Sequence, residues 1–234
     1  MRGTKFPTWG IIVGILMSMT SSTSSAKDDT KSTEGAKPPK DAVVLFDSKD
    51  LSGWSKGSAE KSADWLVKDG YMEVLPGKGD IQTRRKFGDY KLHLEFWIPL
   101  MKDAKGQSRG NSGVYMQGRH EVQVLDSWQN ETYATGVCGA LYGIIAPSTN
   151  ASKPPEQWQT YDITYVAPRV DGSGKVTEKG VITIVHNGVT VIDRGKFDRQ
   201  ADLGKDRRIG TPGPILLQDH GCKVRFRNIW LVPK

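Results

Sequence analysis

Hydrophobic and polar residues alternate in short runs along most of the chain after residue 42. In the clearest run, from Tyr90 to Ile98, apolar side chains occupy every second position. Successive side chains of a β-strand point to opposite faces, so this pattern predicts a strand with one buried face. Further strands are predicted at residues 43–46, 65–68, 71–75, 114–116, 120–126, 161–166, 181–186, 189–192, 215–218 and 224–232.

Turn-forming residues separate these runs. Asp69-Gly70 and Asn187-Gly188 are two-residue hairpin turns of a favoured type. No segment shows the periodicity of an amphipathic helix, and no internal repeat indicates a propeller. We therefore predict a single all-β domain, a β-sandwich or jelly roll, over residues 43–234. In its last strand, one face is expected to carry the apolar residues Val224, Phe226, Trp230 and Val232.

The N-terminal residues have the features of an export signal. Arg2 and Lys5 are followed by a mostly apolar run from Trp9 to Met19, and a Ser/Thr-rich stretch ends at Ala26. The apolar run is about half the roughly 20 residues that a membrane span needs. We therefore interpret residues 1–26 as a signal peptide, and we expect a secreted or periplasmic protein without stable membrane insertion after cleavage.

The segment after the predicted signal peptide indicates a linker, and the distribution of charge bears on the possible partners. Residues 27–42 are rich in Lys, Asp, Ser, Thr and Pro, and are predicted to form a disordered linker. The chain contains 33 Lys and Arg against 26 Asp and Glu, a net charge of +7. These charges are scattered rather than gathered into a basic stripe with aromatic residues, so no nucleic-acid partner is expected. The oligomeric state stays open.

Cys138 and Cys222 are the two cysteines of the chain, too few for a disulfide scaffold or a zinc cluster. An exported location would permit a disulfide between them. Two separate buried thiols are the alternative, and the sequence does not decide between these.

Polar residues gather in three places along the predicted strands. No nucleophile elbow, phosphate loop, zinc-protease motif or dinucleotide fingerprint is present. The three clusters are Asn111-Ser112-Gly113, the segment from Glu121 to Asp126, and Leu217 to Gly221. In a sandwich these clusters could meet on one concave sheet. Gln218 and His220 would share a face if their strand extends that far.

Several of these segments resemble a known family. They are LFDSKDLSGW, FGDYKLHLEFW, NSGVYMQGRHEVQVLD, GALYG, HNGVTVID, GPILLQDHG and VRFRNIWLVP, in this order. The chain resembles the 3-keto-disaccharide hydrolase domain family from about Val43 to Lys234. The resemblance implies a concanavalin A-like jelly roll and an exported hydrolase or lyase. The implied substrate is a small glycoside or oligosaccharide already oxidised at sugar carbon 3.

The chemistry of such a substrate suggests roles for the polar residues. A ketone at C3 acidifies the C2 proton, and the enolate formed by removing that proton expels the aglycone at C1. Glu121 and His220 are candidates for base and acid, in an unassigned order. Substrate binding is expected from Asn111, Gln123, Asp126, Gln218 and Tyr142. A divalent cation at the enolate is an open question, and Glu121, Asp126 and His220 are its candidate ligands.

Other readings of the same residues stay open. The jelly roll also serves non-catalytic carbohydrate-binding modules. An ordinary glycoside hydrolase would need a second carboxylate across the bond from Glu121, and Glu95, Asp126 and Asp219 are candidates. Glu121 could instead form a structural ion pair with Arg119 or Arg225.

Overall fold

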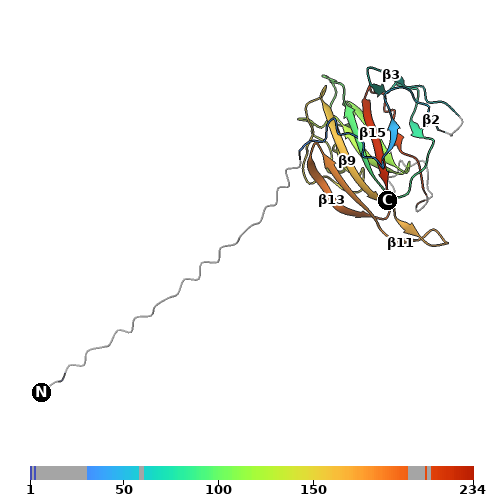
Figure 1. Ribbon diagram of the computed structural model, residues 1–234. Helices are drawn as coiled ribbons and strands as arrows, with labels where there is room; N and C mark the ends of the chain where they lie inside the picture. Colours follow the sequence, from blue (N-terminus) through green and yellow to red (C-terminus); the bar gives the residue numbers. More distant parts are fainter. Residues whose placement is uncertain (2, 4–30, 58–60, 200–208, 210–211) are drawn as a thin grey trace.

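The structure is a computed structural model that describes residues 1, 3, 31–57, 61–199, 209 and 212–234. Two antiparallel sheets pack face to face, as the alternating pattern predicts (Figure 1). Among the described residues, helical structure is limited to two single 3-10 turns, η1 (Gly106–Ser108) and η2 (Ala134–Gly136). No helix in the described ranges has the length and apolar character needed to cross a membrane. The predicted all-β sandwich is confirmed.

The larger sheet has eight strands. Its order is β13 (Val189–Phe197), β12 (Gly180–His186), β9 (Trp158–Val166), β6 (Tyr90–Trp97), β15 (Arg225–Pro233), β4 (Tyr71–Glu73) and β3 (Leu66–Lys68), with β1 (Val43–Phe46) also pairing with β15. The residues of both predicted hairpin turns have positive φ angles, 48° and 82° at Asp69 and Gly70, and 52° and 85° at Asn187 and Gly188. A separate ribbon joins β10 (Arg169–Val170) to β11 (Val176–Glu178).

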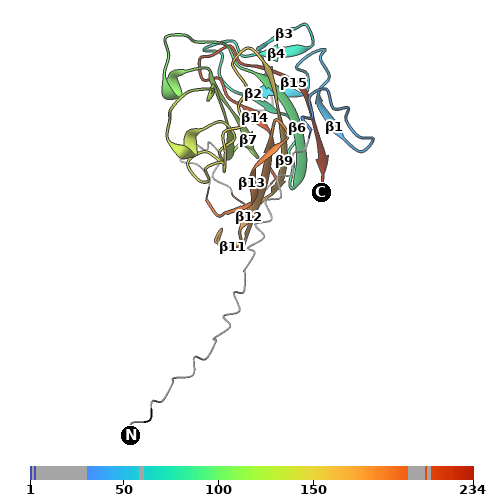
Figure 2. The same cartoon turned by 90° about the vertical axis from the view of Figure 1, so that its left-hand side faces the viewer.

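The smaller sheet has five strands. Its order is β2 (Trp54–Lys56), β5 (Ile81–Thr83), β14 (Leu216–Leu217), β7 (Asn111–Met116) and β8 (His120–Leu125). Figure 2 shows β7 and β14 to one side of β6 and β9, with the loops that carry η1 and η2 beyond β7. The core between the two sheets is built from the inward faces of their strands, including Leu92, Leu94 and Phe96 of β6.

The predicted apolar face of β15 is wrong beyond Arg227, because the strand contains a bulge. Asn228 has φ of 48°, and the register with β6 shifts between Arg227 and Trp230. One extra residue in a strand reverses the alternation beyond it. Phe226 is therefore inward and fully buried, whereas Trp230 is half-buried on the outer face, so the two do not share a face.

The N-terminal segment differs from the predicted linker. The signal peptide and the linker as far as residue 30 lie outside the described residues, apart from residues 1 and 3. Residues 33–36 lie against the outer face of the eight-stranded sheet. There Gly35 N donates to Glu95 Oε1 at 2.7 Å, Asn228 Nδ2 donates to Ala36 O at 2.9 Å, and Glu34 pairs with Arg227 at 3.2 Å. Polar composition alone predicted disorder here, but the buried carboxylate of Glu95 holds the segment in place.

The cysteines are two free thiols. Cys138 is fully buried, and its Sγ lies 3.0 Å from the Tyr161 hydroxyl. Cys222 is also buried, with its Sγ 3.7 Å from Met101 Sδ. Of the two alternatives that the sequence left open, the structure contains the separate buried thiols.

Candidate functional site

The outer face of the five-stranded sheet carries the densest group of predicted site residues. In β7, Val114 and Met116 point into the core, so Asn111, Gly113 and Tyr115 share the outer face. The pairing of β7 with β8 sets Gly113 opposite Gln123 and Tyr115 opposite Glu121. Every residue of both strands is buried, because loops from elsewhere in the chain cover this outer face.

Glu121 is the most perturbed acidic group on this face. Its side chain is almost fully buried, and its Oε2 accepts a hydrogen bond from the Tyr115 hydroxyl at 2.8 Å. Burial raises the pKa of Glu121 to about 7, with a smaller increase from the Asp80 carboxylate, while the Tyr115 hydrogen bond acts in the opposite direction. A carboxyl group with this pKa can both take up and release a proton at neutral pH.

Gly113 leaves space for the Glu121 carboxyl group. A Cβ at position 113 would lie 2.5 Å from Glu121 Oε1 and 2.9 Å from Tyr115 Cε2. On the other side of β7, Gln218 N donates to Gly113 O at 3.0 Å. Gln123, Gly113 and Gln218 thus form one row across the sheet, with the glycine as a gap between two amide side chains.

Each of the two glutamines in this row has a side-chain oxygen that is free to accept a hydrogen bond. Gln123 Nε2 donates to Gln107 Oε1 at 3.0 Å and Gly136 O at 3.4 Å. Gln218 Nε2 donates to the Tyr115 hydroxyl at 3.1 Å. Each amide group uses its nitrogen within the protein. The Oε1 atoms of both are buried and accept no hydrogen bond from the described part of the chain, which makes them acceptors suited to hydroxyl groups.

Asn111 belongs to the same face. Its Nδ2 donates to Gln107 O at 2.9 Å, which ties the start of β7 to η1. Gln107 Nε2 in turn donates to Gly136 O at 2.9 Å in η2. The three amide side chains of Asn111, Gln107 and Gln123 therefore form one network that holds the covering loops to the sheet.

Two tyrosines lie beside Glu121. Tyr142 N donates to Glu121 O at 2.9 Å, and the hydroxyl groups of Tyr142 and Tyr133 are in hydrogen-bond contact. Tyr133 is half-exposed, and burial together with the Tyr142 contact raises its pKa to about 12. The Tyr133 hydroxyl therefore keeps its proton at neutral pH. Because the contact between the two tyrosines uses one O–H group, one donor of the pair is left for a ligand.

Asp126 has a structural partner. Its Oδ2 lies 2.8 Å from Arg109 Nη2, and burial raises its pKa while Arg109 lowers it. Asn130 Nδ2 also donates to Asp126 O at 2.7 Å. Asp126 therefore fastens the end of β8 to the loop before β7, which is a role in shaping the site.

His220 differs from Glu121 in its exposure to solvent and in its local partners. β14 ends at Leu217, so the alternation that would align His220 with Gln218 does not continue. The His220 side chain is exposed on the following turn and makes no hydrogen bond or ion pair with any described residue. The neighbouring Asp219 instead accepts hydrogen bonds from Gly79 N and Gly221 N. In the described part of the chain, no hydrogen bond or ion pair joins the side chains of Glu121 and His220, so their assignment as an acid–base pair stays a prediction.

The candidate metal ligands are likewise not gathered. Across the described ranges, no group of three or more His, Cys, Asp or Glu residues is arranged to hold a metal ion. Glu121, Asp126 and His220 thus do not form the cluster considered from the sequence, because each belongs to a different local network.

Three residues of the site were missed by the sequence interpretation. Tyr115 could have been found, because it shares a strand face with Gly113 in the NSGVYM segment. Gln107 and Tyr133 come from the covering loops. Loops lack the regular alternation that predicts which way a side chain points. The rival partner for Glu121 proposed from sequence, Arg225, instead pairs with Glu73 at 2.6 Å.

The fold defines an antiparallel β-sandwich protein with a buried acid–amide face, and comparison with known proteins assigns its family. The model of the 3-keto-alpha-glucoside-1,2-lyase-like domain matches residues 41–232. The chain belongs to this family, which confirms the resemblance seen in the sequence. Comparison with curated proteins found no match.

Solved structures from Parabacteroides distasonis ATCC 8503 share the fold. One, described as a candidate glycosyl hydrolase, is 40% identical with a TM-score of 0.78, and the match covers 84% of this chain and 85% of that one. A second with the same description is 22% identical with a TM-score of 0.61, covering 82% and 94%. A third is 21% identical with a TM-score of 0.57, covering 82% and 99%. The last two support the fold alone.

Proposed function

We propose that this protein is an exported enzyme that cleaves 3-keto-glycosides, with Glu121 as the base that removes the C2 proton. The observation that carries the proposal is the buried Glu121 carboxyl group, whose pKa of about 7 suits proton transfer near neutral pH. Membership of the 3-keto-alpha-glucoside-1,2-lyase-like family supports this class of substrate.

The reaction balances without a co-reactant other than water. Glu121 takes the proton from C2, and the electron pair of the C–H bond forms the enolate of the C3 ketone. The enolate then re-forms the C3 ketone, a C1–C2 double bond forms and the C1–O bond breaks. The aglycone oxygen takes up the proton that Glu121 removed, which restores the Glu121 carboxylate. Addition of water across the resulting enone completes a net hydrolysis, whereas release of the enone would be a lyase reaction.

The surrounding side chains supply the remaining requirements. The enolate oxygen needs a hydrogen-bond donor, and the Tyr133–Tyr142 pair beside Glu121 has one O–H group that is not used between the two tyrosines. The free Oε1 atoms of Gln123 and Gln218 would accept hydrogen bonds from sugar hydroxyl groups. Tyr115 holds the Glu121 carboxyl group in position. We assign His220 no part in the proton transfer.

The proposed location rests on the N-terminal sequence pattern. Export of a chain cleaved after Ala26 would place the enzyme in the periplasm or outside the cell. N-terminal sequencing of the exported protein should find a start near residue 27, and a chain in the membrane fraction that still begins at Met1 would contradict the proposal.

One assay separates the candidate functions. The protein is incubated with p-nitrophenyl 3-keto-glucoside and p-nitrophenyl glucoside, with and without a chelator, and nitrophenol release is followed. Release from the keto substrate alone supports the proposal. Equal release from both would indicate an ordinary glycoside hydrolase, and saturable binding without release would indicate a binding module. Loss of activity with chelator would show a metal requirement.

A further inference from the structure

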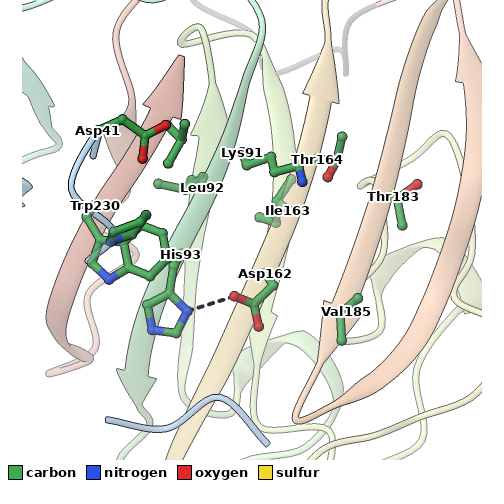
Figure 3. Close-up of a pocket in the computed structure, with 12 residues that line it drawn as sticks. Asp41, Lys91, Leu92, His93, Asp162, Ile163, Thr164, Thr183, Val185 and Trp230 are labelled. Carbon is green, nitrogen blue, oxygen red and sulfur yellow. Dashed lines mark hydrogen bonds and ion pairs between the residues drawn. The ribbon is translucent and has the colours of Figure 1, made fainter. Parts of the chain in front are cut away.

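A hollow lies on the outer face of the eight-stranded sheet (Figure 3). Glu121 is on the other sheet of the sandwich. The volume of the hollow is about 470 Å³. Strands β6, β9, β12 and β15 line it, and Pro39 and Asp41 of the N-terminal segment form one wall. It shares no residue with the candidate site described above.

The floor of this hollow is a regular array of outward side chains. Strand pairing places them in two consecutive rows across the same four strands. The first row is Trp230, His93, Asp162 and Val185, and the second is Val232, Lys91, Thr164 and Thr183. Over β9 and β12 the side chains are short, while Trp230 and the N-terminal segment are bulky at the other side. This difference in side-chain size produces the hollow.

One end of the array is rigid. The His93 ring is buried and lies between Asp162, whose Oδ1 is 2.8 Å from Nδ1, and Trp230, which stacks on it at 4.8 Å with a 20° interplanar angle (Figure 3). Thr33 also donates to Asp162 Oδ2. The half-buried Trp230 ring is thereby held in a fixed orientation at the edge of the hollow.

The other end has polar groups without partners. Within the described part of the chain, Lys91 and Asp41 form no ion pair, and the Thr164 hydroxyl forms no hydrogen bond. These groups offer an ammonium donor, a carboxylate acceptor and a hydroxyl that can do either. The carboxylates of Asp41 and Asp162 line the hollow together with Lys91 and His93, so neither sign of charge dominates the lining.

We propose that this hollow binds a short stretch of a neutral oligosaccharide without cleaving it. A sugar presents many hydroxyl groups that need both donors and acceptors, and C–H surfaces that pack on valine and tryptophan side chains. An anionic ligand would face Asp41 and Asp162, and an apolar ligand would leave Lys91 and Asp41 desolvated without partners. The site would hold a glycan on the sheet that does not carry Glu121.

The test measures binding of maltohexaose, cellohexaose and laminarihexaose by calorimetry, with hexagalacturonate as the acidic comparison. Glu121→Gln protein is used alongside the wild type, so that turnover does not consume the sugar. We expect at least one neutral hexasaccharide to bind both proteins in the millimolar range. Thr164→Phe, which fills the floor, and Lys91→Met should each weaken that binding by about tenfold or more.

Matched controls use the same substitutions outside the hollow. Thr177→Phe on β11 (Val176–Glu178) and Lys196→Met on β13 should leave binding unchanged. Three results would overturn the proposal: no neutral hexasaccharide binding, binding that Thr164→Phe and Lys91→Met leave intact, or binding that is lost only in Glu121→Gln protein. Failure of the proposed 3-keto activity, with binding that depends on Thr164, would leave this inference standing.

Discussion

The Tyr115 hydroxyl donates a hydrogen bond of 2.8 Å to Glu121 Oε2 across the β7–β8 pair. Tyr115 itself accepts a hydrogen bond from Gln218 Nε2 at 3.1 Å. Burial raises the pKa of Tyr115 well above its ordinary value, so the hydroxyl keeps its proton and remains a donor. This contact orients the carboxyl group and partly offsets the cost of ionising it in a buried place.

Replacing Glu121 by Gln should lower kcat on a 3-keto-glucoside by about 10²–10⁴-fold, because the base is lost while the shape is kept. Glu131→Gln, on an exposed loop, is the matched control and should retain activity. Circular dichroism should show the same fold in both variants. A Glu121→Gln protein of near-normal activity would remove Glu121 from the mechanism.

The same substitution should change the pH dependence of stability. The pKa of Glu121 is raised from 4.5 in the unfolded chain to about 7 in the fold, so the folded state binds more protons between these values. The contribution of Glu121 to the free energy of unfolding is therefore greatest below pH 4.5. It falls by roughly 2–4 kcal/mol as the pH rises to 7. Urea unfolding at several pH values should show this decline in the wild type, reduced in Glu121→Gln.

Tyr115→Phe should raise the pKa of Glu121 further, because the hydroxyl that stabilises the carboxylate is removed. The acidic limb of the kcat/KM pH profile should shift to higher pH, and kcat near neutrality should fall. Tyr90→Phe is the control, since the Tyr90 hydroxyl is buried without a hydrogen-bond partner in the described chain. An unshifted profile in Tyr115→Phe would contradict the assignment.

Gly113→Ala should reduce activity strongly, because its Cβ would lie 2.5 Å from Glu121 Oε1 and displace the carboxyl group. Overpacking of this kind costs typically about 1–3 kcal/mol of stability. Gly53→Ala, whose Cβ would approach no atom closer than 3.8 Å, is the matched control. Kinetics and thermal unfolding of both variants measure the effect, and full activity in Gly113→Ala would show that Glu121 tolerates another position.

Alternation predicted much of the fold and part of the site. It identified most of the strands, but not the short β2, β5, β10 and β11. It also put Glu121 and Gln123 on one face, and strand pairing then brought Gln218 to the same row as Gln123. The alignment of His220 with Gln218 was expected only if their strand extended that far, and nothing local shows that β14 ends at Leu217. The end of that strand is set by the turn at Asp219, whose partners Gly79 and Asp80 are about 140 residues away.

Contacts between distant segments explain the other differences. The N-terminal segment is polar and looks unstructured in isolation, yet its backbone and side chains donate hydrogen bonds to the buried Glu95 carboxylate on β6 and to Asp162 on β9. The bulge at Asn228 reverses which side chains of β15 point inward, and no glycine or proline at this position predicts it. Each of these features depends on a partner that local periodicity does not reveal.

Arg227→Met should destabilise the protein by about 1–3 kcal/mol, because it leaves Glu95 buried with fewer donors. Arg227 Nε lies 2.7 Å from Glu95 Oε2, and its guanidinium also packs 3.9 Å from the Trp158 ring centre. Lys49→Met, in the exposed pair with Asp47, should change stability by no more than about 0.5 kcal/mol. Equal unfolding midpoints for the two variants would contradict this role.

Low pH should reduce the stability that the interactions of Glu95 provide. Burial favours the neutral form of Glu95, but hydrogen bonds from His93, Asn228, Gly35 and Arg227 outweigh it and lower the pKa from 4.5 to about 2. A depressed carboxylate pKa stabilises the fold above pH 4.5, and that stability is lost as pH falls towards 2. Glu95→Gln should flatten the stability profile over this range, and a profile identical to that of the wild type would contradict it.

The two cysteines should titrate as two free thiols in unfolded, unreduced protein. In the folded protein Cys138 should react very slowly with a thiol reagent, because burial raises its pKa and little thiolate is present at neutral pH. Cys222, at 8% exposure, should react faster. Cys138→Ser and Cys222→Ser variants assign the two rates. Absence of free thiols after unfolding would reveal a disulfide and would require residues 138 and 222 to approach each other, while two thiols would support the separate buried environments.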